Sequence, residues 1–390
     1  MTLRLRHAAP LLCTALTACG EYTFVTIDSG FDLLPEARAA IAEDGTVAAA
    51  RSQAIVVGDG SAAAGAIDLT GGGFTITAAS ARRPLQIRSE GDIAFVATHA
   101  GVPGCVGDAR GAYRTDAGGV APTILLEHCQ ADGGAQVGPN IALSPGGTVA
   151  VSDIVNGQGA LWRGPVAGPL SSLRTGTGEF FNTGGLDVDD SGRVSAQMEY
   201  FDGFAGGLMR GVLAFDTPEQ AKAEIVTAVE KLGIGAQPPH ATNAAGTMAL
   251  SINNPMSLNI GGTVYDFAAG VYVAHPTAFN SPKDLTLVAG LDGPYCRVGA
   301  VDIDDAGAVY FEAQLDAEGH CGSAFWDGIF HGGDPTTDAV VARGAAELGD
   351  HQYFDSIRLG EVNGGGQVAF LTTYSEPLVP PFMLWRADPV

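Results

Sequence analysis

Basic residues are scarce in this sequence of 390 residues. It holds 20 Lys and Arg against 43 Asp and Glu, which gives a formal net charge of −23 at pH 7. The lysines are confined to Lys222, Lys231 and Lys283, and the arginines are scattered, so the sequence shows no basic stripe. Because nucleic-acid binding requires clustered Lys and Arg that neutralise phosphates, we expect no nucleic acid as a partner. The acidity mainly predicts solubility.

Long apolar runs and known catalytic motifs are also missing. No stretch approaches the roughly 18 apolar residues of a membrane-spanning helix. The chain has no GxSxG, Walker, SxxK or HExxH motif. The histidines beyond the N-terminal segment are dispersed, without paired spacing: His99, His128, His240, His275, His320, His331 and His351. The sequence therefore identifies no catalytic residue.

Aromatic residues make up only 7% of the chain, whereas glycine occurs 55 times. This balance is typical of many short strands joined by tight turns, because glycine adopts turn conformations without strain. Trp162, Trp326 and Trp385 lie in or beside a recurring aromatic strand. We expect them to pack in the core and not to form a ligand cage.

The first eighteen residues have the features of an export signal. Arg4 and Arg6 precede an apolar run, Ala8 to Leu16, that is too short to span a bilayer permanently. The segment ends in Leu-Thr-Ala-Cys, which resembles a bacterial lipobox, so Cys19 is the predicted lipidation site and mature N-terminus. An ordinary signal peptide with an incidental cysteine is the alternative. We expect residues 1–18 to be a lipoprotein signal peptide and the mature protein to be lipid-anchored in the bacterial cell envelope, periplasmic or surface-exposed.

A short motif recurs seven times along the rest of the chain. Each copy has an apolar residue, three mostly small or polar residues, glycine, one variable residue and a run of strand-forming residues. The copies are IAEDGTVAA, IRSEGDIAF, LSPGGTVAV, VDDSGRVSA, TNAAGTMAL, IDDAGAVYF and VNGGGQVAF, with glycines Gly45, Gly91, Gly147, Gly192, Gly246, Gly307 and Gly366. The spacings of 46, 56, 45, 54, 61 and 59 residues are near those of propellers and solenoids. The glycine predicts a tight turn with positive φ between two strands.

Each repeat contains further strand-like segments. An aromatic-centred segment follows the turn strand, as in GALWRG and GVYVAH, and a third follows, as in DLTLVAG. With the strand that leads into the turn, each unit has four short strands, the composition of a propeller blade. One region is less regular: Thr217 to Gln220 has the features of a helix start, so we expect a helix at 217–223 and a strand at 224–232.

The motif copies carry a family resemblance. VNGGGQVAF, IDDAGAVYF and IRSEGDIAF resemble the repeats of the bacterial tandem-repeat proteins named for their NxxGxxAF motif. The motif asparagine is present at Asn243 and Asn363, and its phenylalanine at Phe95, Phe311 and Phe370. The resemblance spans nearly the whole mature chain, and it implies no assigned chemistry.

The two ends of the chain predict how the ring closes. The last repeat lacks its outer strand, and Tyr22 to Gly30 aligns with the outer strand at 285–293. We therefore expect an all-β fold over residues 19–390, a seven-bladed β-propeller of four-stranded antiparallel blades. The N-terminal strand would complete the C-terminal blade and remove an exposed sheet edge.

Two of the turns resemble the first half of a calcium loop. Asp187, Asp189 and Ser191 precede or adjoin Gly192 in the D-x-D-x-S-G pattern, and a similar pattern precedes Gly307. The acid that such a loop needs at its twelfth position is absent, because Met198 and Ala313 stand there. We therefore interpret these residues as hydrogen-bonded turns, with Ca2+ binding as the weaker alternative and no other cofactor or metal expected.

Four cysteines remain beyond Cys13 and Cys19. Cys105 and Cys321 each lie 14 residues after a motif glycine, so they occupy the same loop in two repeats, while Cys129 and Cys296 end or follow outer strands. In an exported protein this predicts disulfides Cys105–Cys129 and Cys296–Cys321.

Three classes of function stay open at this stage. A complete scaffold without a catalytic motif favours a non-enzymatic, membrane-anchored binding protein for a protein or glycan ligand. The alternative is a hydrolase or lyase with its site at the mouth of the central channel. Ionisable side chains that converge in the channel with shifted pKa values would favour that enzyme. A structural envelope protein without a selective partner is the third class.

Overall fold

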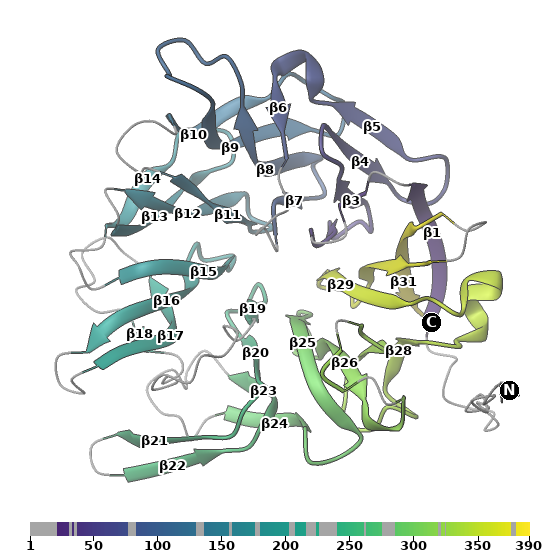
Figure 1. Cartoon of the computed structure of the whole chain (residues 1–390). Coiled ribbons are helices and arrows are strands. Elements are labelled where there is room, and N and C mark those ends of the chain that lie inside the picture. The colour runs from purple at the N-terminus through teal and green to yellow at the C-terminus, as the bar shows by residue number, and fades with distance from the viewer. Residues whose placement is uncertain are drawn as a thin grey trace, which may run out of the picture.

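The computed structural model arranges small antiparallel sheets radially around a centre (Figure 1). It describes residues 22–30, 33–34, 37–76, 83–129, 136–155, 158–175, 180–202, 207–215, 224–225, 240–260, 263–274, 285–318, 321–323, 325–375 and 380–390. In these ranges no helix is long and apolar enough to cross a membrane. The predicted signal peptide and Cys19 lie outside the described residues. The architecture is an all-β propeller.

Six sheets have four strands each, and in each the strand before the glycine turn lies at one edge. Repeat 1 forms β2 (Ala40–Ile41), β3 (Val47–Ala50), β4 (Ala54–Gly58) and β5 (Gly65–Asp68). Repeat 3 forms β11 (Gln136–Leu143), β12 (Thr148–Val155), β13 (Gln158–Pro165) and β14 (Ser171–Thr175). Repeat 4 forms β15 (Phe180–Val188), β16 (Val194–Asp202), β17 (Gly207–Phe215) and β18 (Glu224–Ile225).

The later repeats follow the same order. Repeat 5 forms β19 (His240–Thr242), β20 (Met248–Ile252), β23 (Gly270–Ala274) and β24 (Leu285–Gly290). Repeat 6 forms β25 (Tyr295–Ile303), β26 (Val309–Leu315), β27 (Gly328–Phe330) and β28 (Ala339–Ala342). Repeat 7 forms β29 (Ser356–Val362), β30 (Val368–Thr373) and β31 (Phe382–Pro389), and its fourth strand is β1 (Tyr22–Gly30). Three short 3-10 helices are η1 (Thr70–Gly72), η4 (Asp316–Glu318) and η5 (Ala346–His351).

Repeat 2 departs from the predicted four strands. Its sheet has five: β6 (Phe74–Thr75), β7 (Leu85–Ile87), β8 (Asp92–His99), β9 (Ala109–Asp116) and β10 (Thr123–Cys129). Because β7 covers only one half of β8, β6 pairs with the other half, from Phe74 opposite His99. The buried Phe74 ring stacks on His99 with centroids 4.2 Å apart. The prediction of four strands in every blade therefore needs correction: six sheets have four strands and one has five.

Two further elements complete the description. β21 (Met256–Ile260) and β22 (Thr263–Phe267) form a hairpin between β20 and β23 that the sequence did not predict. The predicted helix at 217–223 lies outside the described residues, and of the strand expected at 224–232 the structure describes Glu224–Ile225. β1 pairs antiparallel with β31, from Tyr22 opposite Pro389 to Gly30 opposite Phe382. The first and last strands of the chain thus share one sheet.

Apolar contacts between neighbouring sheets form the core. One cluster joins repeats 6 and 7 through Ile329, Phe354, Phe370 and Trp385, and another joins repeats 7 and 1 through residues such as Leu384. Trp326 and Trp385 are buried, as expected for core residues, whereas Trp162 is partly buried against the cluster between repeats 2 and 3. Such packing gives each sheet its stability through its neighbours and not alone.

All seven motif glycines occupy tight turns with positive φ, between 78° and 88°. In each turn the glycine N–H donates to the carbonyl three residues earlier, as Gly366 does to Asn363. The carbonyl of the residue after the glycine accepts from the N–H of that same earlier residue. This is the hydrogen-bond pattern of a short hairpin loop with glycine in the left-handed position. This confirms the predicted role of the glycine.

The structure also explains the motif asparagine. Asn363 Oδ1 accepts from Gln367 N at 3.0 Å, which caps its own turn, and its Nδ2 donates to Ala42 O of repeat 1 at 3.1 Å. Asn243 repeats both contacts, with Thr247 N and with Asp304 O of repeat 6. Asp189 and other acidic or hydroxyl residues at this position make only the first contact. The asparagine therefore links a turn to the turn of the next repeat.

The residue two before the glycine makes a second link. Gly364 N donates to the Glu43 carboxylate at 3.0 Å, and Ala244 N donates to Asp305 Oδ1 at 3.2 Å. Each bond runs from one repeat to the next. We call the seven glycine turns, residues 42–45, 88–91, 144–147, 189–192, 243–246, 304–307 and 363–366, the turn ring. Much of its acidity serves these links between repeats.

Both predicted disulfides are present. Cys105 pairs with Cys129 and Cys296 pairs with Cys321, with Cα atoms 5.3 Å and 5.8 Å apart. Cys105 and Cys321 lie in the segments after β8 and β26. Cys129 ends the outer strand β10, whereas Cys296 lies at the start of β25, the strand that follows the outer strand β24. This is the end of the strands opposite to the turn ring.

Candidate functional site

A pocket of about 330 Å3 lies at the end of the central channel that the turn ring surrounds. All seven repeats contribute to its lining, which includes six acidic residues and two arginines: Glu43, Glu90, Asp187, Asp302, Asp305, Glu361, Arg83 and Arg88. The volume falls within the range of small-molecule sites. Its polar lining sets it apart from the apolar contacts between the sheets.

Most polar groups deep in the pocket come from one repeat position, five residues before the motif glycine. We call this set the channel ring: Ala40, Gln86, Ala142, Asp187, Ala241, Asp302 and Glu361. Its four polar members line the pocket. The other three members are alanines, whose small side chains leave the centre of the channel to longer side chains from elsewhere.

Asp187 and Asp302 have the same local structure. Asp187 Oδ1 accepts from Val188 N at 2.9 Å, and Asp302 Oδ1 accepts from Ile303 N at 3.0 Å. Their second oxygens reach the next repeat, where Asp187 Oδ2 accepts from Thr242 N at 2.7 Å. Asp302 Oδ2 accepts in the same way from Val362 N at 3.0 Å. Both carboxylates are therefore fixed by backbone groups of two sheets.

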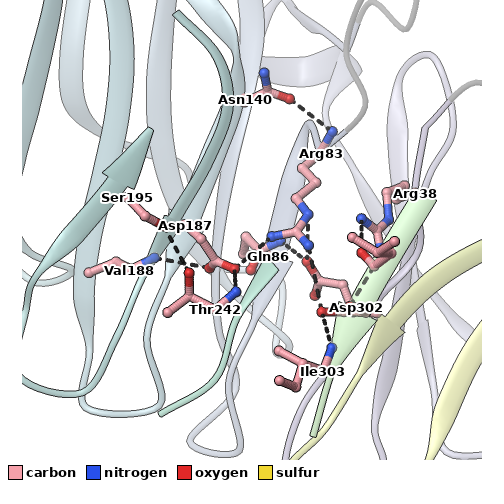
Figure 2. Close-up of polar contacts among 12 residues, drawn as sticks. Arg38, Arg83, Gln86, Asn140, Asp187, Val188, Ser195, Thr242, Asp302 and Ile303 are labelled. Atoms are coloured by element: carbon pink, nitrogen blue, oxygen red, sulfur yellow. Dashed lines mark hydrogen bonds and ion pairs between the residues drawn. The ribbon is translucent and has the colours of Figure 1, made fainter. Parts of the chain in front are cut away.

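Arg83 crosses the channel and contacts three of its carboxylates. Figure 2 shows its guanidinium between Asp187 and Asp302. Nη1 lies 3.2 Å from Asp187 Oδ2, Nη2 lies 3.7 Å from Asp302 Oδ1, and Nε lies 3.9 Å from Glu361 Oε1. Only 7% of the Arg83 side chain is exposed. One cation from repeat 2 thus binds carboxylates of repeats 4, 6 and 7.

Arg38 is a second cation in this network. Its Nη2 lies 3.2 Å from Asp302 Oδ2, and its Nε donates to Gly360 O at 2.9 Å. Glu361 in turn accepts a short hydrogen bond from Gln86 Nε2. The remaining pocket arginine, Arg88, is held by Asp92, with Nε 2.8 Å from Oδ2.

Burial shifts the acid–base behaviour of this network. It raises the pKa of Glu361 to about 7, with Arg83 opposing the shift. It also raises the pKa of Asp302, against the effect of Arg83 and Arg38. Burial lowers the pKa of His240 to about 4, and the charges of Asp187 and Arg83 act on it in opposite directions. This imidazole is therefore neutral at pH 7. Ionisable groups with shifted pKa values do converge in the channel.

The calcium candidates are not brought together. The Asp187 carboxylate faces Arg83, whereas Asp189 Oδ1 accepts from Ser191 Oγ at 2.6 Å and from Arg193 N at 2.9 Å. These are the contacts of a hydrogen-bonded turn. Within the described residues, no three His, Cys, Asp or Glu side chains form a group that could hold a metal ion.

None of the histidines within the described residues lines the pocket. These are His99, His128, His240, His331 and His351, whereas His275 and His320 lie outside the described residues. Arg83, Gln86, Asp302 and Glu361 were not predicted as a pocket. The available signal was the channel-ring position, which is alanine in three repeats and polar in four.

Comparisons with known proteins bear on the fold. No protein-family model and no curated protein matches the sequence. The chain is similar to a prolyl endopeptidase, with a TM-score of 0.51 and 8% identity over 96% of this chain and 50% of that one. It therefore spans half the length of that protein.

Two other solved structures show weaker likeness. A streptogramin B lyase has a TM-score of 0.49 and 11% identity, over 96% of this chain and 100% of that one. The β-propeller domain of Cps50 (Swd1) from Myceliophteria thermophila also has 0.49, with 12% identity over 94% and 99%. At such identities the likeness to the endopeptidase shows the β-propeller fold alone.

Proposed function

We propose that this protein is an exported, lipid-anchored binding propeller that takes a small polar ligand in the channel pocket. In this proposal the five-stranded sheet and the six four-stranded sheets are seven blades, and β1 closes the ring. The pairing of β1 with β31 and the apolar cluster between repeats 7 and 1 support this closure. The NxxGxxAF resemblance is part of the same proposal.

One observation carries the binding function. A pocket lined by all seven repeats contains six acidic residues whose deep members are held by backbone hydrogen bonds. Fixed polar groups in a concave site lower the cost of ordering on binding. A ligand smaller than a protein fits the pocket, so we place the binding of a glycan or other small molecule ahead of binding to a protein face.

A pocket-filling variant tests this function. Ser89 is exposed and lines the pocket, so Ser89→Trp should fill its mouth. Ser191 is another exposed turn serine outside the pocket lining, and Ser191→Trp is the matched control. Proteins captured from envelope extract are denatured, and released small molecules are identified by mass spectrometry. The proposal predicts one molecule retained by the wild type and Ser191→Trp but lost from Ser89→Trp. No small molecule on the wild type, or equal retention by all three, would contradict it.

The convergence of ionisable groups with shifted pKa values in the channel supports a second candidate, a lyase or hydrolase in which Glu361 transfers a proton. A carboxyl with a pKa of about 7 beside Arg83 matches a general acid or base that works near neutral pH. The same capture experiment separates the two functions. A binding protein returns the ligand unchanged, whereas an enzyme converts it with a rate that Glu361→Gln abolishes.

The lipid anchor is tested by fractionation. Cys19→Ser should move the protein from the membrane fraction to the soluble fraction. Persistence of that variant in membranes would refute the lipobox assignment.

A further inference from the structure

Arg83 has a buried donor without a hydrogen-bond partner among the described residues. This donor is Nη2, whose contact with Asp302 Oδ1, at 3.7 Å, is too long for a hydrogen bond. The Arg83 side chain is 93% buried, because 7% is exposed, and it lines the pocket. A buried donor left unsatisfied costs about 1–3 kcal/mol. An acceptor atom from a ligand in the pocket would satisfy it.

Glu361 offers the complementary group. Its Oε1 accepts from Gln86, whereas Oε2 accepts no hydrogen bond from any described residue. Glu361 also lines the pocket, and its Oε1 lies 3.9 Å from Arg83 Nε. The pocket lining therefore includes an unsatisfied donor on Arg83 and an acceptor with free capacity on Glu361, whose other oxygen lies 3.9 Å from the same guanidinium group. A hydroxyl group can accept from the first and donate to the second.

The surrounding charge excludes an anion. Arg83 is already flanked by Asp187, Asp302 and Glu361, and the rim adds Glu43 and Asp305. A ligand carboxylate or phosphate at Arg83 would meet these like charges. Aliphatic residues line the same pocket and provide an apolar wall: Ile41, Ile87, Leu143, Val188, Ile303 and Val362.

We infer that the pocket binds a non-anionic saccharide, one of whose hydroxyls accepts from Arg83 Nη2 and donates to the Glu361 carboxylate. The aliphatic wall contacts the C–H face of the sugar ring, and the acidic rim tolerates a neutral or amino substituent. This inference rests on the proposed function, because it assigns a ligand class to the same pocket.

Calorimetric titration of the mature protein tests the ligand class. The probes are methyl glucoside, methyl galactoside, methyl mannoside, N-acetylglucosamine, glucosamine and the anionic sugar glucuronate. We expect at least one neutral or amino sugar to bind, and glucuronate to bind at least tenfold more weakly than that sugar. Failure of every neutral and amino sugar to bind would overturn the inference, as would tighter binding of glucuronate.

Two variants test the contact. Glu361→Gln removes the carboxylate and should weaken binding at least tenfold. Glu127→Gln is the control, because Glu127 lies outside the pocket lining and accepts hydrogen bonds from Tyr113 and His99 through Oε1. The affinity of this variant for the sugar should stay within twofold of the wild type. Equal affinities of the two folded variants would also overturn the inference. If sugars fail but the capture experiment still yields a pocket-dependent molecule, the ligand class is wrong and the binding function stands; if both fail, the function itself is wrong.

Discussion

The turn ring and the channel ring lie within a few residues of each other in every repeat, yet they differ in regularity. All seven turns have the same glycine conformation and the same hydrogen bonds. The channel-ring position alternates between alanine and a polar residue through repeats 1 to 6 and is glutamate in repeat 7, and only the polar residues of this ring line the pocket. A position that serves the fold must satisfy the same geometry in each blade. A position that serves a site at the channel centre has no such constraint and differs among repeats.

The largest effect should come from the channel. Arg83→Met leaves Asp187, Asp302 and Glu361 without their shared cation, and we expect a loss of about 3–5 kcal/mol in the free energy of unfolding. Urea unfolding followed by circular dichroism measures it. Arg386→Met is the counterpart at the turn ring. Arg386 Nη1 donates to Gly45 O at 2.7 Å and its guanidinium pairs with the partly exposed Asp388, so the loss should be only about 1–2 kcal/mol. Equal losses would remove the distinction between the rings.

The pH dependence sharpens the same comparison. Because burial raises the pKa of Glu361 from 4.5 to about 7, only the folded protein retains this proton between those values. The retained proton therefore stabilises the folded protein. This contribution to the free energy of unfolding is complete below pH 4.5, and about 3 kcal/mol of it is lost as the pH rises through 7. His240 acts in the opposite direction, since its pKa falls from 6.5 to about 4 and its contribution is lost as the pH decreases through 4.

The variant Glu361→Gln isolates the first effect. Its unfolding free energy, minus that of the wild type, should rise by about 3 kcal/mol between pH 4.5 and pH 7.5. Denaturant unfolding at several pH values measures this difference, in which the His240 contribution cancels. A difference independent of pH would mean that Glu361 is not buried in the network.

The disulfides provide a test remote from both rings. Replacing Cys296 and Cys321 by serine opens a loop of 25 residues and should lower the free energy of unfolding by about 3 kcal/mol. Saccharide or captured-ligand binding by the folded variant should not change, because neither cysteine lines the pocket. Lost affinity in that folded variant would show that the pocket depends on the opposite end of the channel.

The smallest effect concerns the side chain of one turn-ring residue. Asn363→Asp keeps the acceptor that caps the turn but removes the Nδ2 donor to Ala42 O and Gln367 Oε1, and should cost about 1–2 kcal/mol. Asn363→Ala removes both contacts and should cost more. Thermal unfolding ranks them, and an inverted order would refute the assigned role of the asparagine.

The rings also explain what could be predicted from the sequence. The turns, the strands that flank them and the cysteine pairs were predictable, because glycine at positive φ and equal cysteine offsets are local signals. Strand β6 was not, since its pairing depends on the unpaired half of β8.

The pocket escaped prediction for a physical reason. Arg83, Asp187 and Glu361 are far apart in sequence. Asp187 and Glu361 lie in strands and Arg83 lies just before β7, so none of them belongs to a local sequence motif for this site. Asp187 was singled out for a calcium loop, and its actual partner is an arginine two repeats earlier. The radial arrangement of the sheets brings these charges together.

Ligand binding by variants of the two rings is the most direct test. Asp189 belongs to the turn ring but not to the pocket lining, and Asp189→Asn keeps a side-chain oxygen that can accept from Arg193 N. The molecule captured by the wild type is titrated into Glu361→Gln and Asp189→Asn under conditions where both are fully folded. We predict at least tenfold weaker binding by Glu361→Gln and wild-type affinity for Asp189→Asn. Wild-type affinity for Glu361→Gln, or an equal loss in Asp189→Asn, would contradict the assignment of binding to the channel ring.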